Sequence, residues 1–468
     1  MATNKPIPFV GSPGQRATGE TDSRYVNVLF EIDKNPAPGT FPVNCVKRPG
    51  LSTSTQPFGG SAVGRGVFHW PVTGDIYSVF GTSTFVNAST LTSTMTSATG
   101  RVWFTPIHEV TGAAKLMISD GLIDYQVLST NVISTTSTYA TAHSGSAVEM
   151  DGFYFHAFAD GKIRNTAVNT VSTWPSGGFL TADTYGSDLQ CIYRQKDQIL
   201  GFTKNRIEFF FNNGNPTNSP LLRIDQNTIA MGIAHKNSLA SSGEIACFVS
   251  ENPGDGAMRS VYMIQSLGKV AEIADSKIKR FLNAEGLSIS SCSAWMATLS
   301  GQLVYHLNLA AANRSFQYGV DSGLWAEAED TVSTKLNLVS ATSKNGVVYA
   351  QHATDGRIYT FQPTVYQDAG TSFEVVLQTA RSNFGSGKKK YEDVVEVVGD
   401  TSTGTLNVDV SDDDYASWTT VGEIDMSQPS KRATRLGAFY ARAHRFRYAA
   451  NAPFRVQAFI PGVRVGTG

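Results

Sequence analysis

The chain has 468 residues, of which 16% are charged, and its 38 basic and 39 acidic side chains give a formal net charge of −1. This balance argues against a dedicated nucleic-acid-binding protein, because such proteins normally carry an excess of basic residues. The length exceeds that of one ordinary hydrophobic core and favours two or three domains, although a β-propeller can hold about 300 residues in one unit.

Residues 1–60 are expected to form an extended N-terminal arm. They are rich in Pro and Gly, and their one strand-like run, Tyr25–Ile32, lies between loops. Met1–Gly14 lacks the apolar stretch of a signal peptide, and no apolar run in the chain approaches the roughly 18 residues of a membrane span. An arm of this kind buries little by itself, so either it packs on a neighbouring domain or subunit or it is disordered.

Between Gly74 and Phe361 the sequence repeats an apolar strand, a tight turn and a second apolar strand seven times. The clearest copies turn at Asp160-Gly161 and Asp355-Gly356, and Asp-Gly between alternating apolar runs is a strong hairpin signal. The turns lie about 46 residues apart on average, close to the roughly 40 to 45 residues of a propeller blade. An all-β fold is therefore predicted, with a β-propeller of about six to seven blades over residues 61–368.

The alternative is an irregular array of β-sandwiches, which we disfavour because radial closure protects strand edges. The number of blades stays open, since the units at 244–264 and 302–318 could be split or merged. It also stays open whether the N-terminal arm supplies a strand that closes one blade. One helix is expected near residues 275–285 as an insertion between blades. Asp275 or Ser276 can cap it, and three apolar residues follow on one face: Ile278, Phe281 and Leu282.

In residues 369–468 the expected strands follow one another at a different spacing, which predicts a small C-terminal β-sandwich. The six expected strands are Phe373–Thr379, Tyr391–Val398, Thr405–Val410, Trp418–Ile424, Phe439–Tyr448 and Phe454–Ile460. The charge in this region is divided, because Glu396–Asp425 holds eight acids and no Lys or Arg, whereas Gln428–Gly468 holds eight basic residues and no acid. The two blocks either pair within the chain on adjacent strands or meet across a subunit interface.

Known catalytic and metal-binding patterns fail on inspection. His108-Glu109 lacks the second histidine of a zinc-protease helix, and Gly385–Lys389 lacks the leading glycine and the trailing Ser or Thr of a phosphate loop. The four cysteines have no close spacing of a metal or redox site. Histidines in strands are interpreted as hydrogen-bonded structural residues, among them His156, His306 and His352. We therefore predict no catalytic, cofactor-binding or metal-binding residues.

Ser411–Trp418 resembles the Asp-box hairpin of sialidases, Ser-x-Asp-x-Gly-x-Thr-Trp, with Tyr415 in place of the glycine. It occurs outside the expected propeller, so we interpret it as a hairpin fixed by bonds from an aspartate to the backbone, with Trp418 packed beneath. It leaves an alternative function open, a glycan-binding or glycan-cleaving propeller of a receptor-recognition apparatus. A pocket at the propeller axis with converging Asp, Glu, Arg and Tyr would be its sign. A generic propeller scaffold for protein complexes is a third alternative.

Five motifs follow one another in an order and spacing that match a known family. They are Asn205–Phe211, Gly232–Ala234, Phe248–Pro253, Ser260–Ile264 and Ile278–Arg280. The agreement extends to Arg24, Asn27 and Lys47–Gly50, to the stretch 316–325 and to the run from Arg435 to Pro453. Over nearly its whole length the chain resembles the tail-hub or nozzle protein of short-tailed bacteriophages, the packaged-DNA stabilisation family. The loops at 212–220 and 254–259 depart from the family pattern.

The resemblance implies a structural virion protein of the phage tail, made in the host cytoplasm, rather than an enzyme. Copies of it would form a sixfold ring beneath the portal and adaptor and extend the conduit through which DNA is retained and then ejected. Tailspikes or tail fibres, a tail plug or needle, and double-stranded DNA that passes without sequence-specific binding would be further partners. The near-zero net charge agrees, because tight phosphate contacts would hold DNA that must slide.

Two sets of charged residues are candidates for function under this interpretation. Acidic side chains suit the lumen of a DNA conduit, and the candidates are Asp412, Asp413 and Asp414. The basic run is placed at subunit or adaptor contacts, and its candidates are Arg435, Arg442, Arg445 and Arg447.

Overall fold

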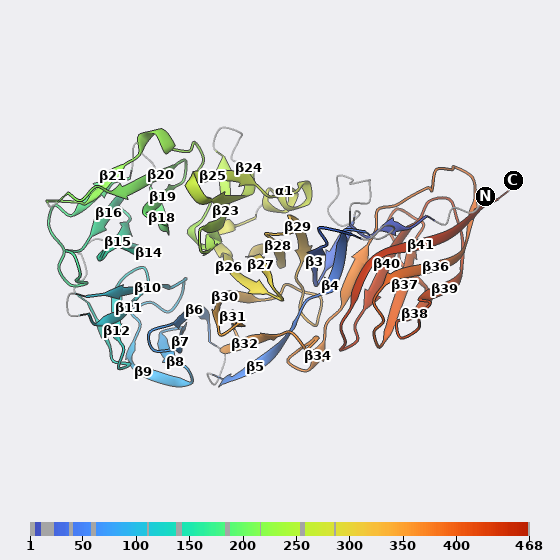
Figure 1. Ribbon diagram of the computed structural model, residues 1–468, viewed down its shortest axis with the longest axis horizontal. Coiled ribbons are helices and arrows are strands. Elements are labelled where there is room, and N and C mark those ends of the chain that lie inside the picture. The colour runs from blue at the N-terminus through green and yellow to red at the C-terminus, as the bar shows by residue number, and fades with distance from the viewer. Residues whose placement is uncertain are drawn as a thin grey trace.

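The computed structural model describes residues 5–10, 23–36, 41–57, 62–109, 112–136, 143–182, 188–215, 217–252, 258–284 and 287–466. The molecule is elongated and has two parts, a ring of blades and a β-sandwich beside it (Figure 1). Within the described residues, no helix is both long enough and apolar enough to cross a membrane.

Seven blades of four antiparallel strands each make up the ring in the described part of the chain. Blade one comprises β6 (Gly64–Trp70), β7 (Asp75–Phe80), β8 (Ser83–Val86) and β9 (Ser89–Thr94). Blade two comprises β10 (Trp103–His108), β11 (Ala114–Ser119), β12 (Asp124–Leu128) and β13 (Ile133–Thr135). Blade three comprises β14 (His143–Met150), β15 (Phe153–Phe158), β16 (Lys162–Asn165) and β17 (Phe179–Thr181). Blade four comprises β18 (Leu189–Gln195), β19 (Gln198–Thr203), β20 (Ile207–Asn212) and β21 (Leu221–Arg223).

The last three blades include the units at 244–264 and 302–318, for which the sequence did not decide whether they are separate blades. Blade five comprises β22 (Ala240–Ser242), β23 (Ile245–Asn252), β24 (Met258–Gln265) and β25 (Lys269–Glu272). Blade six comprises β26 (Cys292–Leu299), β27 (Gln302–Leu309), β28 (Arg314–Gly319) and β29 (Leu324–Glu327). Blade seven comprises β30 (Leu338–Lys344), β31 (Val347–His352), β32 (Arg357–Gln362) and β5 (Gly50–Pro57). The two units therefore stay separate, in blades five and six.

The blade repeat comes from the hairpins expected from the sequence. Gly161 and Gly356 have φ angles of 79° and 69°, a left-handed conformation that glycine adopts without steric cost. Each of them follows an aspartate in the turn between two apolar strands. The first strands of blades one to seven start about 46 residues apart on average, in agreement with the blade spacing, so the prediction of an all-β propeller is confirmed.

The ring closes through a strand from the N-terminal region. β5 pairs antiparallel with β32 and becomes the fourth strand of blade seven, with Leu51 opposite Phe361. Blades seven and one are joined through their first strands at the inner edge of the ring. There Thr342 Oγ1 of β30 accepts a hydrogen bond from the His69 amide of β6 at 2.9 Å. Blade seven thus combines the first and the last strands of the propeller in chain order.

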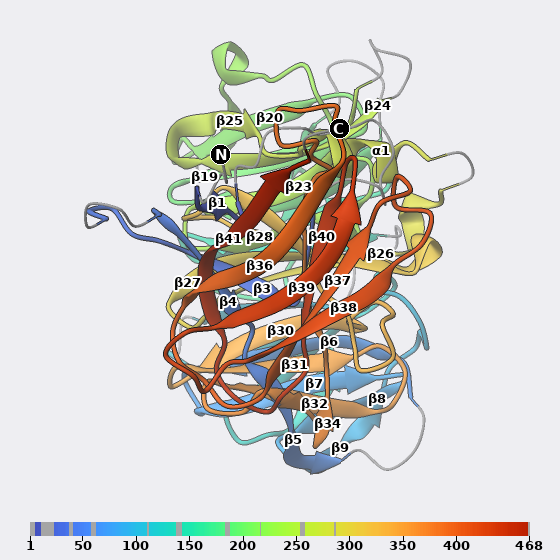
Figure 2. The same cartoon turned by 90° about the vertical axis from the view of Figure 1, so that its right-hand side faces the viewer.

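The sandwich has two sheets, and Figure 2 shows it with β36 to β41 in the foreground. One sheet has the order β3 (Val28–Ile32), β4 (Val43–Lys47), β41 (Arg455–Val465), β36 (Lys390–Gly399) and β39 (Arg432–Phe439), and β1 (Ile7–Pro8) pairs with β41. The other has the order β2 (Arg24–Val26), β35 (Val375–Gln378), β40 (Ala443–Tyr448), β37 (Thr405–Ser411) and β38 (Thr419–Asp425). Apolar residues of both sheets form one core, including Phe30, Leu377, Val397, Phe446 and Phe459.

The sandwich and the propeller share a sheet. β2 pairs parallel with β29 of blade six through Val26 and Glu327, and antiparallel with β35 of the sandwich. The described strands of the region expected as an arm are therefore built into both parts, β1 to β4 in the sandwich and β5 in blade seven. Two short strands, β33 (Gln367–Asp368) and β34 (Thr371–Ser372), extend the sheet of blade seven at β5.

Helix α1 (Ser276–Leu282) lies between blades five and six. Asp275 caps it by accepting a hydrogen bond from the Ile278 amide at 2.8 Å. Ile278 and Leu282 are buried, and the Phe281 ring lies 5.3 Å from that of Phe316 in blade six. The apolar face of the helix thus packs on the propeller.

Candidate functional site

Oppositely charged residues of the sandwich pair within the chain on neighbouring strands. Asp409 of β37 lies opposite Arg445 of β40 and accepts hydrogen bonds from Arg445 Nε at 2.8 Å and from Arg447 Nε at 2.6 Å. Burial opposes the charge of Asp409, but hydrogen bonds from Arg447, Thr420 and Arg445 hold its pKa below the ordinary value. Two of the four candidate arginines are thus engaged with one carboxylate.

A second cluster connects the two sheets of the sandwich. Arg442, just before β40, donates through Nε and Nη2 to both oxygens of Asp412 at 2.8 Å, and through Nη1 to Glu392 Oε2 at 2.9 Å. His444 Nε2 lies 2.9 Å from Glu392 Oε1. Burial opposes the charge of Glu392, but His444 and Arg442 hold its pKa below the ordinary value. Arg442 and Glu392 are both buried.

The remaining basic residues differ in their surroundings, and Lys431 is buried, with its Nζ atom 3.4 Å from Thr401 Oγ1. Arg455 pairs with Glu31 at 3.0 Å and Arg464 with Asp393 at 3.0 Å. Arg435 is exposed, has a φ of 63° and lies at a bulge where β39 shifts its register against β36. No ion pair among the described residues includes Arg435. Five of the eight basic residues therefore pair within the chain, and Arg435 is the one candidate arginine that faces solvent without such a pair.

The three candidate acids form the turn between β37 and β38, and each has a partner in the chain. Asp413 accepts from the Ser417 amide at 3.0 Å and from the hydroxyl groups of Ser417 and Ser411, and these bonds lower its pKa to about 2. Asp412 pairs with Arg442, and Asp414 lies 3.5 Å from Arg381. Asp413 thus fixes the turn through its bonds to the Ser417 amide and to the two hydroxyl groups.

A buried ion cluster that sequence reasoning missed joins the propeller to the sandwich. Glu327 of β29 accepts from Lys277 of α1 at 2.6 Å, from Arg24 of β2 at 2.9 Å and from Arg314 of β28 at 3.2 Å. Burial opposes the charge of Glu327, but Lys277 and Arg24 lower its pKa to about 2. The neighbouring Glu329 pairs with Arg24, yet burial raises its pKa. No local motif marks these residues, because they come from four separate elements.

Two cavities lie among the first strands of the blades. One, of about 330 Å³, is lined by Arg65, Arg101, Lys335 and polar residues of blades one, six and seven. The other, of about 310 Å³, lies along β10, β14, β18 and β22 and is lined by Trp103, Tyr193 and Glu149 among others. Glu149 pairs with Arg194 at 2.9 Å and is the one carboxylate among the described residues that line these two cavities. The paired carboxylates of a glycosidase are therefore not found among them.

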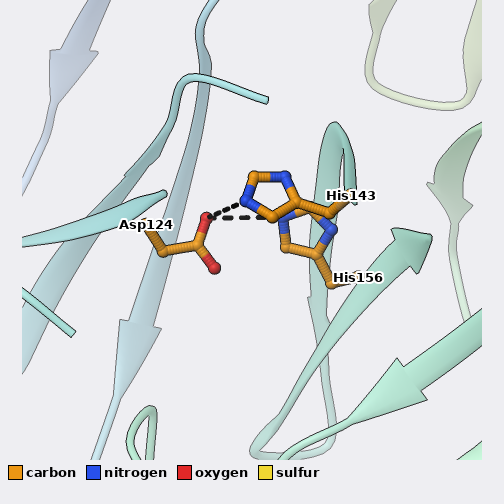
Figure 3. A group of neighbouring side chains, drawn as sticks. All are labelled: Asp124, His143 and His156. Atoms are coloured by element: carbon orange, nitrogen blue, oxygen red, sulfur yellow. Dashed lines mark ion pairs between the residues drawn. The ribbon is translucent and has the colours of Figure 1, made fainter. Parts of the chain in front are cut away.

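Asp124, His143 and His156 meet in the interior of the propeller, between blades two and three (Figure 3). Asp124 starts β12, whereas His143 and His156 come from β14 and β15. Asp124 Oδ1 lies 3.4 Å from His156 Nε2 and 3.8 Å from His143 Nε2. Burial and the neighbouring His156 lower the pKa of His143 to about 4. The three positions lie 19 and 13 residues apart in the sequence, so no ligand motif announces them.

The other two histidines interpreted as structural have different surroundings. His306 is buried and stacks on Trp295, with ring centroids 4.6 Å apart. His352 is partly exposed, and its Nδ1 atom lies 3.1 Å from Asp355 Oδ1. Neither belongs to a group of three potential metal ligands among the described residues.

Comparisons with solved structures find distant likenesses at low sequence identity. Among solved structures, a streptogramin B lyase has 13% identity and a TM-score of 0.42 over 66% of this chain and 95% of its own. A virginiamycin B lyase from Staphylococcus aureus has 10% identity and a TM-score of 0.41 over 68% and 98%. The WD40 propeller domain of Doa1 has 12% identity and a TM-score of 0.39 over 67% and 97%. No curated protein matches the sequence.

A family model described as Bacteriophage P22 Gp10, beta-propeller, matches residues 44–366, more than half of the chain. This span begins just before β5, the strand that closes the ring, and ends just after β32, its neighbour in blade seven. The match therefore covers the complete propeller, and the chain belongs to the phage packaged-DNA stabilisation family that P22 Gp10 represents.

Proposed function

We propose that copies of this chain form a sixfold ring, the tail hub or nozzle, below the portal and adaptor of a short-tailed phage. The family match over residues 44–366 carries this proposal, because the family consists of phage virion structural proteins that stabilise packaged DNA. In the ring the chain would retain the genome and later form part of the conduit for its ejection. Tailspikes or tail fibres and a tail plug or needle would bind to the same assembly.

The connection between propeller and sandwich supports a role as a rigid building block. The two parts share the backbone hydrogen bonds of β2 and the buried cluster around Glu327. Arg48 adds a further link, because it pairs with Asp368 at 2.5 Å and its guanidinium lies 3.7 Å from the centre of the Phe373 ring. A subunit that must hold pressurised DNA in a ring needs such stiffness and needs no nucleophile.

The sandwich offers a surface for contacts with a neighbouring subunit or the adaptor. Arg435 is exposed on β39, Tyr391 on the neighbouring β36 is 41% exposed, and Tyr440, which directly follows β39, is 62% exposed. Arginine and tyrosine are enriched at protein interfaces. Arg445 and Arg447, which are held by Asp409, are each about a quarter exposed and can contribute at the edge of such a contact. Arg442 is buried and would act only by supporting the fold.

The net charge of the chain supports passage of DNA. With 38 basic and 39 acidic residues, it lacks the excess of cations that would bind phosphates tightly and slow a sliding duplex. The turn at Asp412–Asp414 is a candidate for the lumen, since Asp413 carries its charge at an exposed hairpin. Repulsion between such a turn and phosphates would keep DNA from adhering to the wall.

The test is the sedimentation mass of the purified chain, alone and after mixing with the portal and adaptor complex of the same phage. We expect the mass of the complex to rise by six copies of the chain. A complex that gains no copies, together with a monomer that binds or cleaves a surface glycan, would instead support the receptor-recognition function. An increase by a different number of copies would overturn the sixfold ring.

A further inference from the structure

We propose that Asp124, His143 and His156 bind one divalent transition-metal ion, with zinc as the best fit, and that this ion fastens blade two to blade three. No metal site is predicted from the sequence, so this proposal departs from that expectation. It is independent of ring formation, because it concerns the interior of a single propeller. The argument rests on the direction of the lone pairs, the distances and the burial of the three side chains.

Hydrogen bonding around His156 leaves its Nε2 atom without a proton in the neutral ring. Its Nδ1 atom lies 3.1 Å from the Ala157 carbonyl oxygen and can reach it only as an N–H donor. The bare Nε2 then accepts from the Ser119 hydroxyl, whose oxygen lies 3.2 Å away. A backbone carbonyl that orients the second nitrogen is the usual arrangement for a histidine that binds a metal.

The same serine determines the state of His143. Because the Ser119 proton points to His156, its oxygen is free to accept from His143 Nδ1, at 3.4 Å. His143 Nε2 is then also bare. Neither His143 Nε2 nor Asp124 Oδ1 has a hydrogen-bond partner among the described residues, although both atoms are buried. The lone pairs of His143 Nε2 and Asp124 Oδ1 therefore converge with no proton between them, an arrangement that a cation would stabilise. His156 Nε2 becomes the third ligand when the Ser119 hydroxyl turns its proton away from it.

The distances between the three side chains are close to those between ligands of one metal ion. Zinc binds nitrogen at about 2.0 to 2.1 Å and carboxylate oxygen at about 2.0 to 2.2 Å, so tetrahedral ligands lie about 3.3 to 3.6 Å apart. Asp124 Oδ1 lies 3.4 and 3.8 Å from the two Nε2 atoms, and the second distance is too long for a hydrogen bond. One ligand atom from each residue lies within 4.8 Å of the others. Ser119 Oγ or a water could take the fourth position.

The chemical types of the three ligands indicate which class of metal ion would bind. Two imidazoles and one carboxylate suit zinc and its neighbours in the first transition row, whereas magnesium and calcium prefer oxygen ligands alone. The side chains of Asp124, His143 and His156 are only 3%, 2% and 0% exposed. The ion must therefore enter while the two blades assemble, and it should leave only when they separate.

The alternative occupant is a proton, which would make one histidine an imidazolium beside Asp124. The experiment that separates the two uses full-length protein without a histidine tag. The metal content of the purified protein is measured first, and the protein is then unfolded and refolded with zinc, with cobalt or with a chelator. We expect one metal ion per chain, a melting temperature several degrees higher with zinc than with chelator, and visible absorption bands from bound cobalt.

Two variants control the assignment to this site. Asp124→Asn keeps the shape of the side chain but should remove the cobalt bands and the difference between zinc and chelator. His352→Asn is the control, because His352 is a histidine outside the proposed site that pairs with Asp355 alone. This substitution should leave the metal content unchanged. Wild-type protein that refolds to the same melting temperature with zinc and with chelator, and that holds no stoichiometric metal, would overturn the proposal in favour of the proton. Cobalt bands that persist in a folded Asp124→Asn protein would overturn it as well.

Discussion

Arg442 and Glu392 form a buried ion pair that spans the two sheets of the sandwich, with Arg442 Nη1 2.9 Å from Glu392 Oε2. Glu392 belongs to β36 in one sheet, and Arg442 directly precedes β40 in the other. Neither side chain is more than 2% exposed. Removal of one partner would leave the other charge buried without compensation, which is far more costly than loss of a surface pair.

We therefore expect Glu392→Ala to lower the free energy of unfolding by about 3 to 5 kcal/mol. Urea denaturation followed by fluorescence gives the value. Asp393→Asn is the matched control, because Asp393 is the next residue of β36 but holds Arg464 on the surface, and it should change stability little. Equal effects of the two substitutions would contradict a stabilising role for the buried pair.

Glu327 should make the junction between propeller and sandwich sensitive to acid. Its pKa falls from 4.5 to about 2 on folding, so its ionisation stabilises the folded state above about pH 4.5, and this contribution is lost as the pH falls towards 2. Glu327→Gln should cost about 3 kcal/mol at neutral pH and progressively less at acid pH. Urea midpoints of both proteins between pH 7 and pH 3 provide the measurement.

Glu329 offers an internal comparison for this pH dependence. Burial raises its pKa in the folded state, so its ionisation should destabilise the folded state as the pH rises. The stability difference between wild type and Glu329→Gln should thus change with pH in the direction opposite to that for Glu327→Gln. Parallel curves for the two variants would contradict the assignment of the charges.

Closure of the ring by β5 can be tested at Leu51. This side chain is 5% exposed and packs in the core of blades six and seven with Trp295 and Phe361. Leu51→Ala should lower the free energy of unfolding by about 2 to 5 kcal/mol. Leu122→Ala removes the same atoms from a side chain that is 54% exposed and should cost less than about 0.5 kcal/mol. Similar losses in both proteins would show that β5 does not close the ring tightly.

Charge reversal at Arg435 examines the proposed interface without disturbing the fold. Because Arg435 is exposed, Arg435→Glu should leave the melting temperature of the monomer unchanged but reduce its incorporation into the portal and adaptor complex at least tenfold. Arg432→Glu alters another exposed arginine of the same strand and should assemble normally. Normal assembly of Arg435→Glu would exclude this arginine from the contact. Charge reversal at Arg442 would not test an interface, because that residue is buried.

The sequence predicts the propeller because each blade contains a local signal. Asp160-Gly161 and Asp355-Gly356 lie between alternating apolar runs, and that pattern depends on neighbours a few residues away. By contrast, β39 was not predicted as a separate strand. Its bulge places Arg435 and Gly437 at φ angles of 63° and 89°, which interrupts the period of two that marks a strand.

Features that depend on distant residues escaped prediction for a physical reason. The partner of β5 lies about 300 residues further along the chain, and sequence spacing carries no information on such a pairing. The two charged blocks of the sandwich could be recognised, but whether they pair within the chain depended on the register of Asp409 against Arg445. Asp124 and His156 likewise become neighbours only when blades two and three stack.

The position of β5 also orders events during synthesis on the ribosome. β5 emerges with the first 57 residues, but its partner β32 begins at Arg357 and the sandwich strand β41 at Arg455. At about 5 to 20 residues per second, translation needs roughly 15 to 60 s to produce β32 after β5. During this interval the early strands expose unpaired edges that invite aggregation. β1 and β5, which are made early, thus find their partners last, and a polypeptide released before blade seven cannot close its ring.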